Sequence, residues 1–187
     1  MALPLTDKES QPQWFSWALN YPMESRFVKS KSSNNINIHY LQWKPPKGKF
    51  GYNNHSNVET LPQSVVLLHG TAAHAHWYHH IAPFISEDGY EVVAISFSGH
   101  GDSDIDPNMK SGFSVWSKQV VDVCQELKLF DSRRISMPII VGHSLGSHVA
   151  EKVCTEVEPS KIGGLIIFDG GVPHPFRWQY GGNTMEI

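Results

Sequence analysis

The sequence predicts an α/β fold with a mostly parallel sheet, because three short apolar segments are each followed by a glycine-containing turn and then by further chain with helical patterning. The apolar segments are rich in β-branched residues, which is typical of buried parallel strands. Ligands of such sheets bind at the carboxyl ends of the strands, so the three turns mark the expected functional edge. The three units are 64–72, 91–103 and 138–146.

The remaining elements follow from the same patterns. Residues 1–22 are predicted to be an irregular lead-in, residues 23–175 the α/β core, and residues 176–187 a tail. Aromatic residues of the lead-in are expected to pack against the core or to line a groove. Expected strands are 24–31, 36–44, 64–68, 91–96, 138–141 and 162–168, and expected helices are 75–87, 114–129 and 145–157.

The most informative segment is Gly142-His143-Ser144-Leu145-Gly146, which lies between an apolar strand and a helical pattern. A Gly-x-Ser-x-Gly sequence in this context presents the serine hydroxyl at the tip of a strained turn, where only small neighbours fit. The serine would also lie at a helix N-terminus, which favours a developing anion. The alternative is a glycine-rich turn that contains an incidental serine.

The turn after the strand 64–68 reads His69-Gly70-Thr71-Ala72. A backbone N–H from Thr71 or Ala72, paired with the N–H of Leu145, would form an oxyanion hole. Taken alone, this turn is better explained as an ordinary strand end. His69 and His100 are interpreted as turn residues that form hydrogen bonds, and His143 is expected to point away from the reaction centre.

These motifs together resemble the α/β-hydrolase superfamily of the serine hydrolase type, over about residues 24–175. The motifs are His69-Gly70, Gly99-His100-Gly101-Asp102-Ser103 and Gly142-His143-Ser144-Leu145-Gly146, in that order. The resemblance implies that Ser144 is the nucleophile and that Thr71 or Ala72 with Leu145 supply the oxyanion donors. It implies a small-molecule acyl substrate, because relatives that open epoxides carry aspartate in place of the serine. It implies no cofactor.

The resemblance covers only the amino-terminal part of the superfamily pattern, with the sheet truncated after about six strands. A serine nucleophile needs a base and a residue that orients the base. Asp169 is the candidate acid, although a polar residue capping the strand end is the simpler interpretation. His174 is the candidate base and acts only if the tail folds back over Ser144.

An end of the sheet at the strand 162–168 would leave Leu165, Ile166 and Ile167 on an open apolar edge. Three hypotheses follow. The chain is a shortened serine hydrolase, or a hydrolase relative without catalysis that binds a ligand or a protein, or a subunit whose edge strand is completed by self-association.

Composition is compatible with one core, since 40% of the 187 residues are hydrophobic. The formal net charge of −3 indicates neither nucleic acid nor an anionic membrane as a partner. No apolar stretch is long enough to span a membrane, and the first residues lack the pattern of a secretory signal, so a cytoplasmic location is expected.

Four histidines, at positions 74, 76, 79 and 80, follow the first turn. Some pairs are spaced as ligands on one helix face would be, but no carboxylate or cysteine with ligand spacing accompanies them. No metal site is therefore predicted, and the histidines are interpreted as surface or packing residues.

Overall fold

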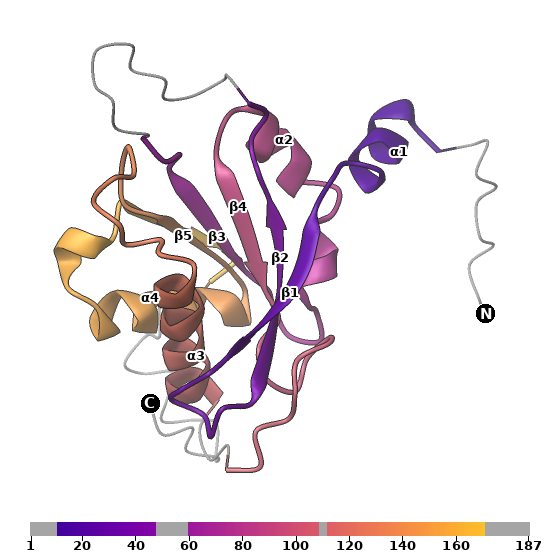
Figure 1. Ribbon diagram of the computed structural model, residues 1–187. Helices are drawn as coiled ribbons and strands as arrows, with labels where there is room; N and C mark the ends of the chain where they lie inside the picture. Colours follow the sequence, from indigo (N-terminus) through magenta and orange to yellow (C-terminus); the bar gives the residue numbers. More distant parts are fainter. Residues whose placement is uncertain (1–10, 48–59, 109–111, 171–187) are drawn as a thin grey trace, which may run out of the picture.

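The strands form one sheet of six in the order β1-β2-β4-β3-β5-β6 (Figure 1). The computed structural model describes residues 11–47, 60–108 and 112–170. β1 pairs with β2 and β2 with β4 in antiparallel fashion, and the remaining pairs are parallel, which confirms the expected mostly parallel sheet. The strands are β1 (Glu24–Lys29), β2 (Asn37–Trp43), β3 (Ser64–Leu68), β4 (Glu91–Ile95), β5 (Ile139–His143) and β6 (Gly164–Phe168).

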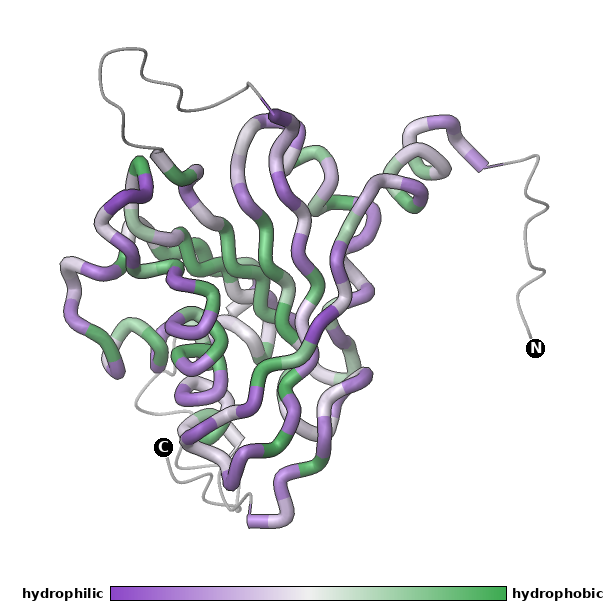
Figure 2. Tube along the Cα trace, viewed as in Figure 1, coloured by the Kyte–Doolittle hydropathy of each residue, from purple (hydrophilic) through white to green (hydrophobic). Residues whose placement is uncertain are grey.

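Helices cover both faces of the sheet. Alternate residues of β3 and β4 enter different cores, because successive strand side chains point to opposite faces. Val66 and Leu68 share one core with α3 (Gly112–Glu126) and α4 (Leu145–Glu156). Val65 and Leu67 share the other with η2 (Ala75–Tyr78) and α2 (Ala82–Glu87), and Figure 2 shows the resulting concentration of hydrophobic residues along the central strands.

The prediction of an irregular lead-in was wrong for residues 13–19, which form helix α1 (Gln13–Leu19). The short segment lacks an acidic first turn and a side-chain cap, so local signals for a helix are weak. Aromatic packing on α2 accounts for it instead: the rings of Trp17 and Phe84 lie 4.8 Å apart and those of Trp14 and Phe84 6.2 Å apart. Tertiary contacts have overridden local propensity here.

The single helix expected at 75–87 consists of two pieces, η2 and α2. Pro83 lies in the first turn of α2, where a missing N–H does no harm and the fixed φ favours a helix start. A further 3-10 helix, η3 (Pro159–Lys161), connects α4 to β6. Within the described ranges, no helix is long and apolar enough to cross a bilayer.

β6 forms one end of the sheet, as the sequence predicts. Leu165, Ile166 and Ile167 are 36–43% exposed there. Self-association through this strand stays a prediction.

A buried ion pair connects β3 and β4 at their amino ends, which lie at the other edge of the sheet from the three turns. The Arg134 guanidinium donates to Glu91 Oε2 and, at 2.7 Å, to Ser64 Oγ, and its Nε donates to the Lys128 carbonyl at 2.9 Å. The side chains of Arg134 and Glu91 are only 5% and 10% exposed. The pair therefore holds the segment before β5 against the first residues of β3 and β4.

Replacing Arg134 with methionine is expected to lower the free energy of unfolding by about 3–5 kcal/mol, because it leaves a buried carboxylate without its counter-charge. Arg133→Met is the matched control, since Arg133 pairs with Asp131 at the surface and such pairs contribute about 1 kcal/mol or less. Urea denaturation measures both. Equal effects of the two substitutions would contradict this assignment.

Candidate active site

Ser144 joins β5 to α4 with a backbone conformation that side chains rarely adopt. Its φ is 51° and its ψ is −116°, and its side chain is half-buried at the carboxyl edge of the sheet. Such strain persists only where the surrounding structure enforces it. Its backbone N–H donates to the Phe168 carbonyl at 2.8 Å, so the end of β6 holds the turn in place.

Gly142 and Gly146 are required by close backbone contacts. A Cβ on residue 142 would lie 2.4 Å from the Gly146 carbonyl oxygen. A Cβ on residue 146 would lie 2.3 Å from the carbonyl oxygen of Leu68, at the end of β3. The two glycines thus allow α4 to begin directly against β3.

This approach brings the turn after β3 beside the serine. A Cβ on Gly70 would lie 3.2 Å from Ser144 Cβ, and the turn is closed by the Ala73 N–H, which donates to the Gly70 carbonyl. Thr71 and Ala72 are the exposed central residues of that turn, and Ala72 has a φ of 58°. Leu145, the first residue of α4, has an N–H that no intrahelical acceptor can reach. The backbone groups predicted for the oxyanion hole therefore belong to adjoining segments.

His69 connects this turn to the end of β4. Its side chain is fully buried, its Nδ1 lies 2.8 Å from the Gly70 carbonyl oxygen, and its Nε2 accepts the Phe97 N–H at 3.1 Å. These partners require a neutral imidazole with hydrogen on Nδ1. Burial lowers the pKa of His69 to about 4, so the ring keeps this form at neutral pH.

His143 lies beside Gly70 in the turn after β3. Its Nδ1 would lie 3.0 Å from a Cβ on Gly70, and its side chain is exposed to solvent. That the side chain points away from the reaction centre stays a prediction. β5 extends to residue 143 rather than ending at 141.

Asp169 directly follows β6 and is exposed, with a φ of 51°. Because the preceding Phe168 carbonyl accepts the Ser144 N–H, the backbones at these two positions are joined. His174, the candidate base, lies outside the described residues.

Sequence reasoning missed Ser147, whose hydroxyl lies 3.0 Å from the Gly142 carbonyl oxygen and 3.2 Å from that of Phe168. Its helical position after the motif gave no signal of this bridging role.

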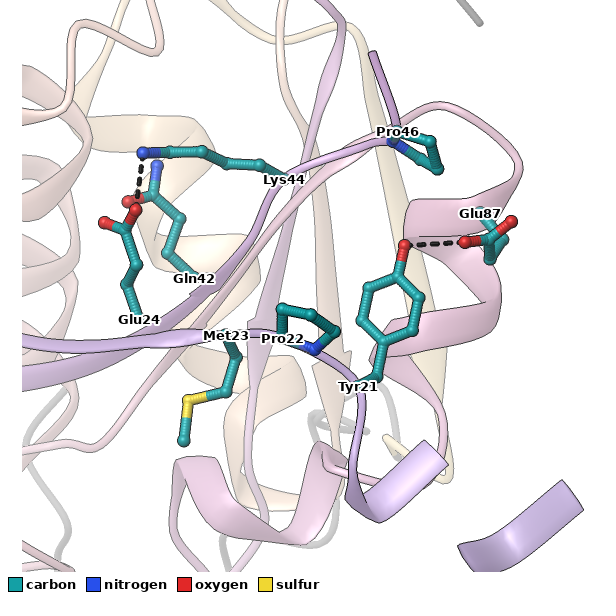
Figure 3. A pocket seen from close by; sticks show the side chains of 8 residues that line it. All are labelled: Tyr21, Pro22, Met23, Glu24, Gln42, Lys44, Pro46 and Glu87. Carbon is teal, nitrogen blue, oxygen red and sulfur yellow. Dashed lines mark hydrogen bonds and ion pairs between the residues drawn. The ribbon is translucent and has the colours of Figure 1, made fainter. Parts of the chain in front are cut away.

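A pocket of about 430 Å³ lies elsewhere, between the start of β1, the end of β2 and α2 (Figure 3). Tyr21 donates to Glu87 at one end, and Lys44 pairs with Glu24 at the other. β2 is antiparallel to β4, so these residues lie near the amino ends of the parallel strands. The pocket is therefore at the edge of the sheet opposite Ser144, where ligands of this kind of fold do not normally bind.

Comparisons with known proteins agree with this fold. The model of a family described as serine aminopeptidase, S33, matches residues 60–172. A serine hydrolase-like protein of Dictyostelium discoideum is 32% identical over 110 residues, which cover 57% of this chain and 28% of that protein.

Solved structures show the same fold. An esterase from Exiguobacterium antarcticum superposes with a TM-score of 0.60 at 19% identity, covering 77% of this chain and 44% of that one. An epoxide hydrolase, VrEH1 from Vigna radiata, superposes with a TM-score of 0.58 at 20% identity, covering 78% of this chain and 38% of that one. Since the two catalyse different reactions, the shared fold does not select one. The chain spans less than half the length of each of these three proteins.

Gly146→Ala is expected to lower the free energy of unfolding by about 1–3 kcal/mol or more, because the new methyl group overlaps the Leu68 carbonyl. Alanine at an unobstructed helical position would instead stabilise by up to about 1 kcal/mol. Gly164→Ala is the control, since its Cβ would lie 3.7 Å from the nearest atom of Ile139. Urea denaturation compares the two. A stabilised Gly146→Ala variant would contradict the close contact.

The buried His69 predicts a loss of stability in acid. Its folded-state pKa of about 4 lies below the ordinary 6.5, so the unfolded chain binds the proton first as the pH falls. The part of the free energy of unfolding that depends on His69 is complete above pH 6.5 and is lost progressively towards pH 4. At pH 5 the loss is about 2 kcal/mol. His69→Asn should remove this part of the pH dependence in urea denaturation at pH 7.5 and 5. An unchanged difference between the two pH values would rule out His69 as its source.

Proposed function

Since the chain belongs to the serine aminopeptidase S33 family of α/β hydrolases, we propose that it is a serine hydrolase that cleaves an ester-like or other acyl substrate through an acyl-enzyme. The observation that carries the proposal is the strained backbone of Ser144 between β5 and α4. The hydroxyl of a serine so placed projects from the turn toward the functional edge.

In the proposed reaction, Ser144 Oγ attacks the substrate carbonyl while a base takes its proton. The carbonyl oxygen becomes an oxyanion that accepts hydrogen bonds from the Leu145 N–H and from the Thr71 or Ala72 N–H, each worth about 3–4 kcal/mol in such sites. The base then protonates the leaving group, whose bond to the carbonyl carbon breaks. Water next attacks the acyl-enzyme, and the acid product is released with Ser144 restored.

The acid and base complete the proposal. Asp169 is the proposed acid, supported by its position one residue after the carbonyl that binds the Ser144 N–H. His174 is the proposed base, supported only by its order in the sequence after Ser144 and Asp169. The substrate is a small molecule with a reactive carbonyl.

Reaction of the purified chain with a fluorophosphonate, followed by intact-mass analysis, tests this function. Fluorophosphonates label serines whose hydroxyl is activated by a base, so one adduct is expected on the natural chain. Ser144→Ala should carry no adduct. Ser132→Ala is the matched control, because Ser132 is exposed in the segment between α3 and β5, and its labelling should be unchanged.

Two outcomes would count against the proposal. A folded chain that forms no adduct has no serine activated by a base. If that chain binds a ligand saturably, and Ser144→Ala binds it equally well, the protein is a binding protein. An adduct that persists in Ser144→Ala would place the reactive group elsewhere. If labelling of His174→Gln equals that of the natural chain, another group is the base.

A further inference from the structure

A second group of polar side chains lies at the carboxyl edge of the sheet, where β2 and β4 meet. His39 of β2 and His76 of η2 have nearly parallel imidazole rings, with centroids 5.3 Å apart. Asp102, in the turn after β4, places Oδ2 2.7 Å from His76 Nε2 and 3.7 Å from His39 Nε2. One donor atom from each of the three lies within 4.8 Å of the others.

The position of His39 is fixed by its surroundings. The residue is fully buried, and its Nδ1 lies 3.2 Å from Ser96 Oγ, which also accepts the Ala75 N–H. With Ser96 as acceptor, the hydrogen is on Nδ1 and the Nε2 lone pair faces Asp102 and the Ser25 hydroxyl, 3.0 Å away. A second hydrogen bond of this kind orients most metal-binding histidines.

The backbone that follows Asp102 is anchored as well. The neighbouring Ser103 hydroxyl accepts the His39 N–H at 2.8 Å and donates to the Ser96 carbonyl at 2.7 Å. One residue further, the Asp104 N–H donates to the Asn37 carbonyl at 2.9 Å. The carboxylate therefore projects from a turn that is tied to β2.

We propose that His39, His76 and Asp102 bind a divalent transition-metal ion, with Zn²⁺ as the best match. Two imidazoles and a carboxylate suit this ion, with ligand bonds of about 2.0–2.2 Å. Three protein ligands leave a fourth tetrahedral position for water. The proposal does not depend on the function of Ser144, whose strand β5 is separated from β4 by β3.

Neighbouring ligand atoms in a tetrahedral zinc site lie roughly 3.3 Å apart, given bonds of that length. The separation between His39 and Asp102 is already near this value, whereas the His76–Asp102 hydrogen bond must open slightly. His76 and Asp102 are 36% and 56% exposed, so their side chains can rotate while the buried His39 stays in place.

The proposed ligand atoms are the Nε2 atoms of two imidazoles and a carboxylate oxygen, and each binds a metal ion in its unprotonated form. In the metal-free chain the His76 Nε2–H donates to Asp102. A metal ion can bind Nε2 only when this hydrogen has left the nitrogen, because the ion needs the nitrogen lone pair.

An unpartnered nitrogen lies beside the group. His74 Nδ1 is buried and has no hydrogen-bond partner among the described residues, and the His74 ring lies 5.4 Å from that of His76. Buried polar atoms are normally paired, and an exception calls for an explanation such as an ion or its water. A water on the proposed ion would give this nitrogen a partner.

Titration of the EDTA-treated full chain with Zn²⁺ by calorimetry, and with Co²⁺ by visible absorption, tests the site. One ion per chain is expected, with a Co²⁺ spectrum of a four-coordinate site, and Zn²⁺ should raise the melting temperature because it binds the folded state. His76→Gln and Asp102→Asn should each weaken Zn²⁺ binding at least tenfold and abolish the rise in melting temperature. His80→Gln, which alters a neighbouring histidine outside the group, should behave as the natural chain.

Absence of Zn²⁺ binding by the folded natural chain would overturn the proposal. So would equal affinity in His76→Gln and Asp102→Asn, since the ion would then be held by other groups. Circular dichroism of the metal-free variants identifies any that fail to fold. His76 is partly exposed, so His76→Gln provides a folded test even if Asp102→Asn does not.

Discussion

The close approach of α4 to the end of β3 is the constraint on which the candidate active site depends. Gly146 contacts the Leu68 and His69 carbonyls at distances that leave no space for a side chain. This contact determines how far Ser144 lies from the turn that contains Thr71 and Ala72. A displaced helix would separate Ser144 from the N–H groups that are proposed to stabilise an oxyanion, and such stabilisation depends on fixed geometry.

The strain at Ser144 is balanced by hydrogen bonds from both sides of the turn. The Phe168 carbonyl accepts the Ser144 N–H, while the Ser147 hydroxyl lies within hydrogen-bond distance of the carbonyls of Gly142 and Phe168. A left-handed φ on a non-glycine residue costs on the order of 1–3 kcal/mol, and it persists because these contacts leave no alternative. β6 thus supports the turn even though its own side chains are largely exposed.

The sequence predicted the strands well, because β-branched runs followed by glycine turns are a local signal. The Gly-x-Ser-x-Gly segment was informative for the same reason, since its glycines report a backbone requirement that is local to the turn. Helix α1 was missed because its stability comes from contacts of Trp14 and Trp17 with Phe84, far along the chain. The proximity of His143 to Gly70 could not be predicted, because it depends on how β5 packs beside the turn after β3.

The histidine-rich segment shows the same limit of local spacing. No metal site was predicted there, because no carboxylate follows at ligand spacing. The site that we propose instead combines His76 with Asp102, 26 residues later in the chain, and with His39 of β2. Ligands gathered from three separate segments leave no spacing pattern to detect.

The neutral imidazole of His69 connects the surroundings of Ser144 to the group formed by His39, His76 and Asp102. His69 bonds to the Gly70 carbonyl on the side of Ser144 and accepts the Phe97 N–H at the start of the turn that carries Asp102. A protonated ring would have hydrogens on both nitrogens and could no longer accept from Phe97. Burial keeps His69 neutral, so the property from which we predict a loss of stability in acid also allows His69 to connect the turn after β3 to the turn after β4.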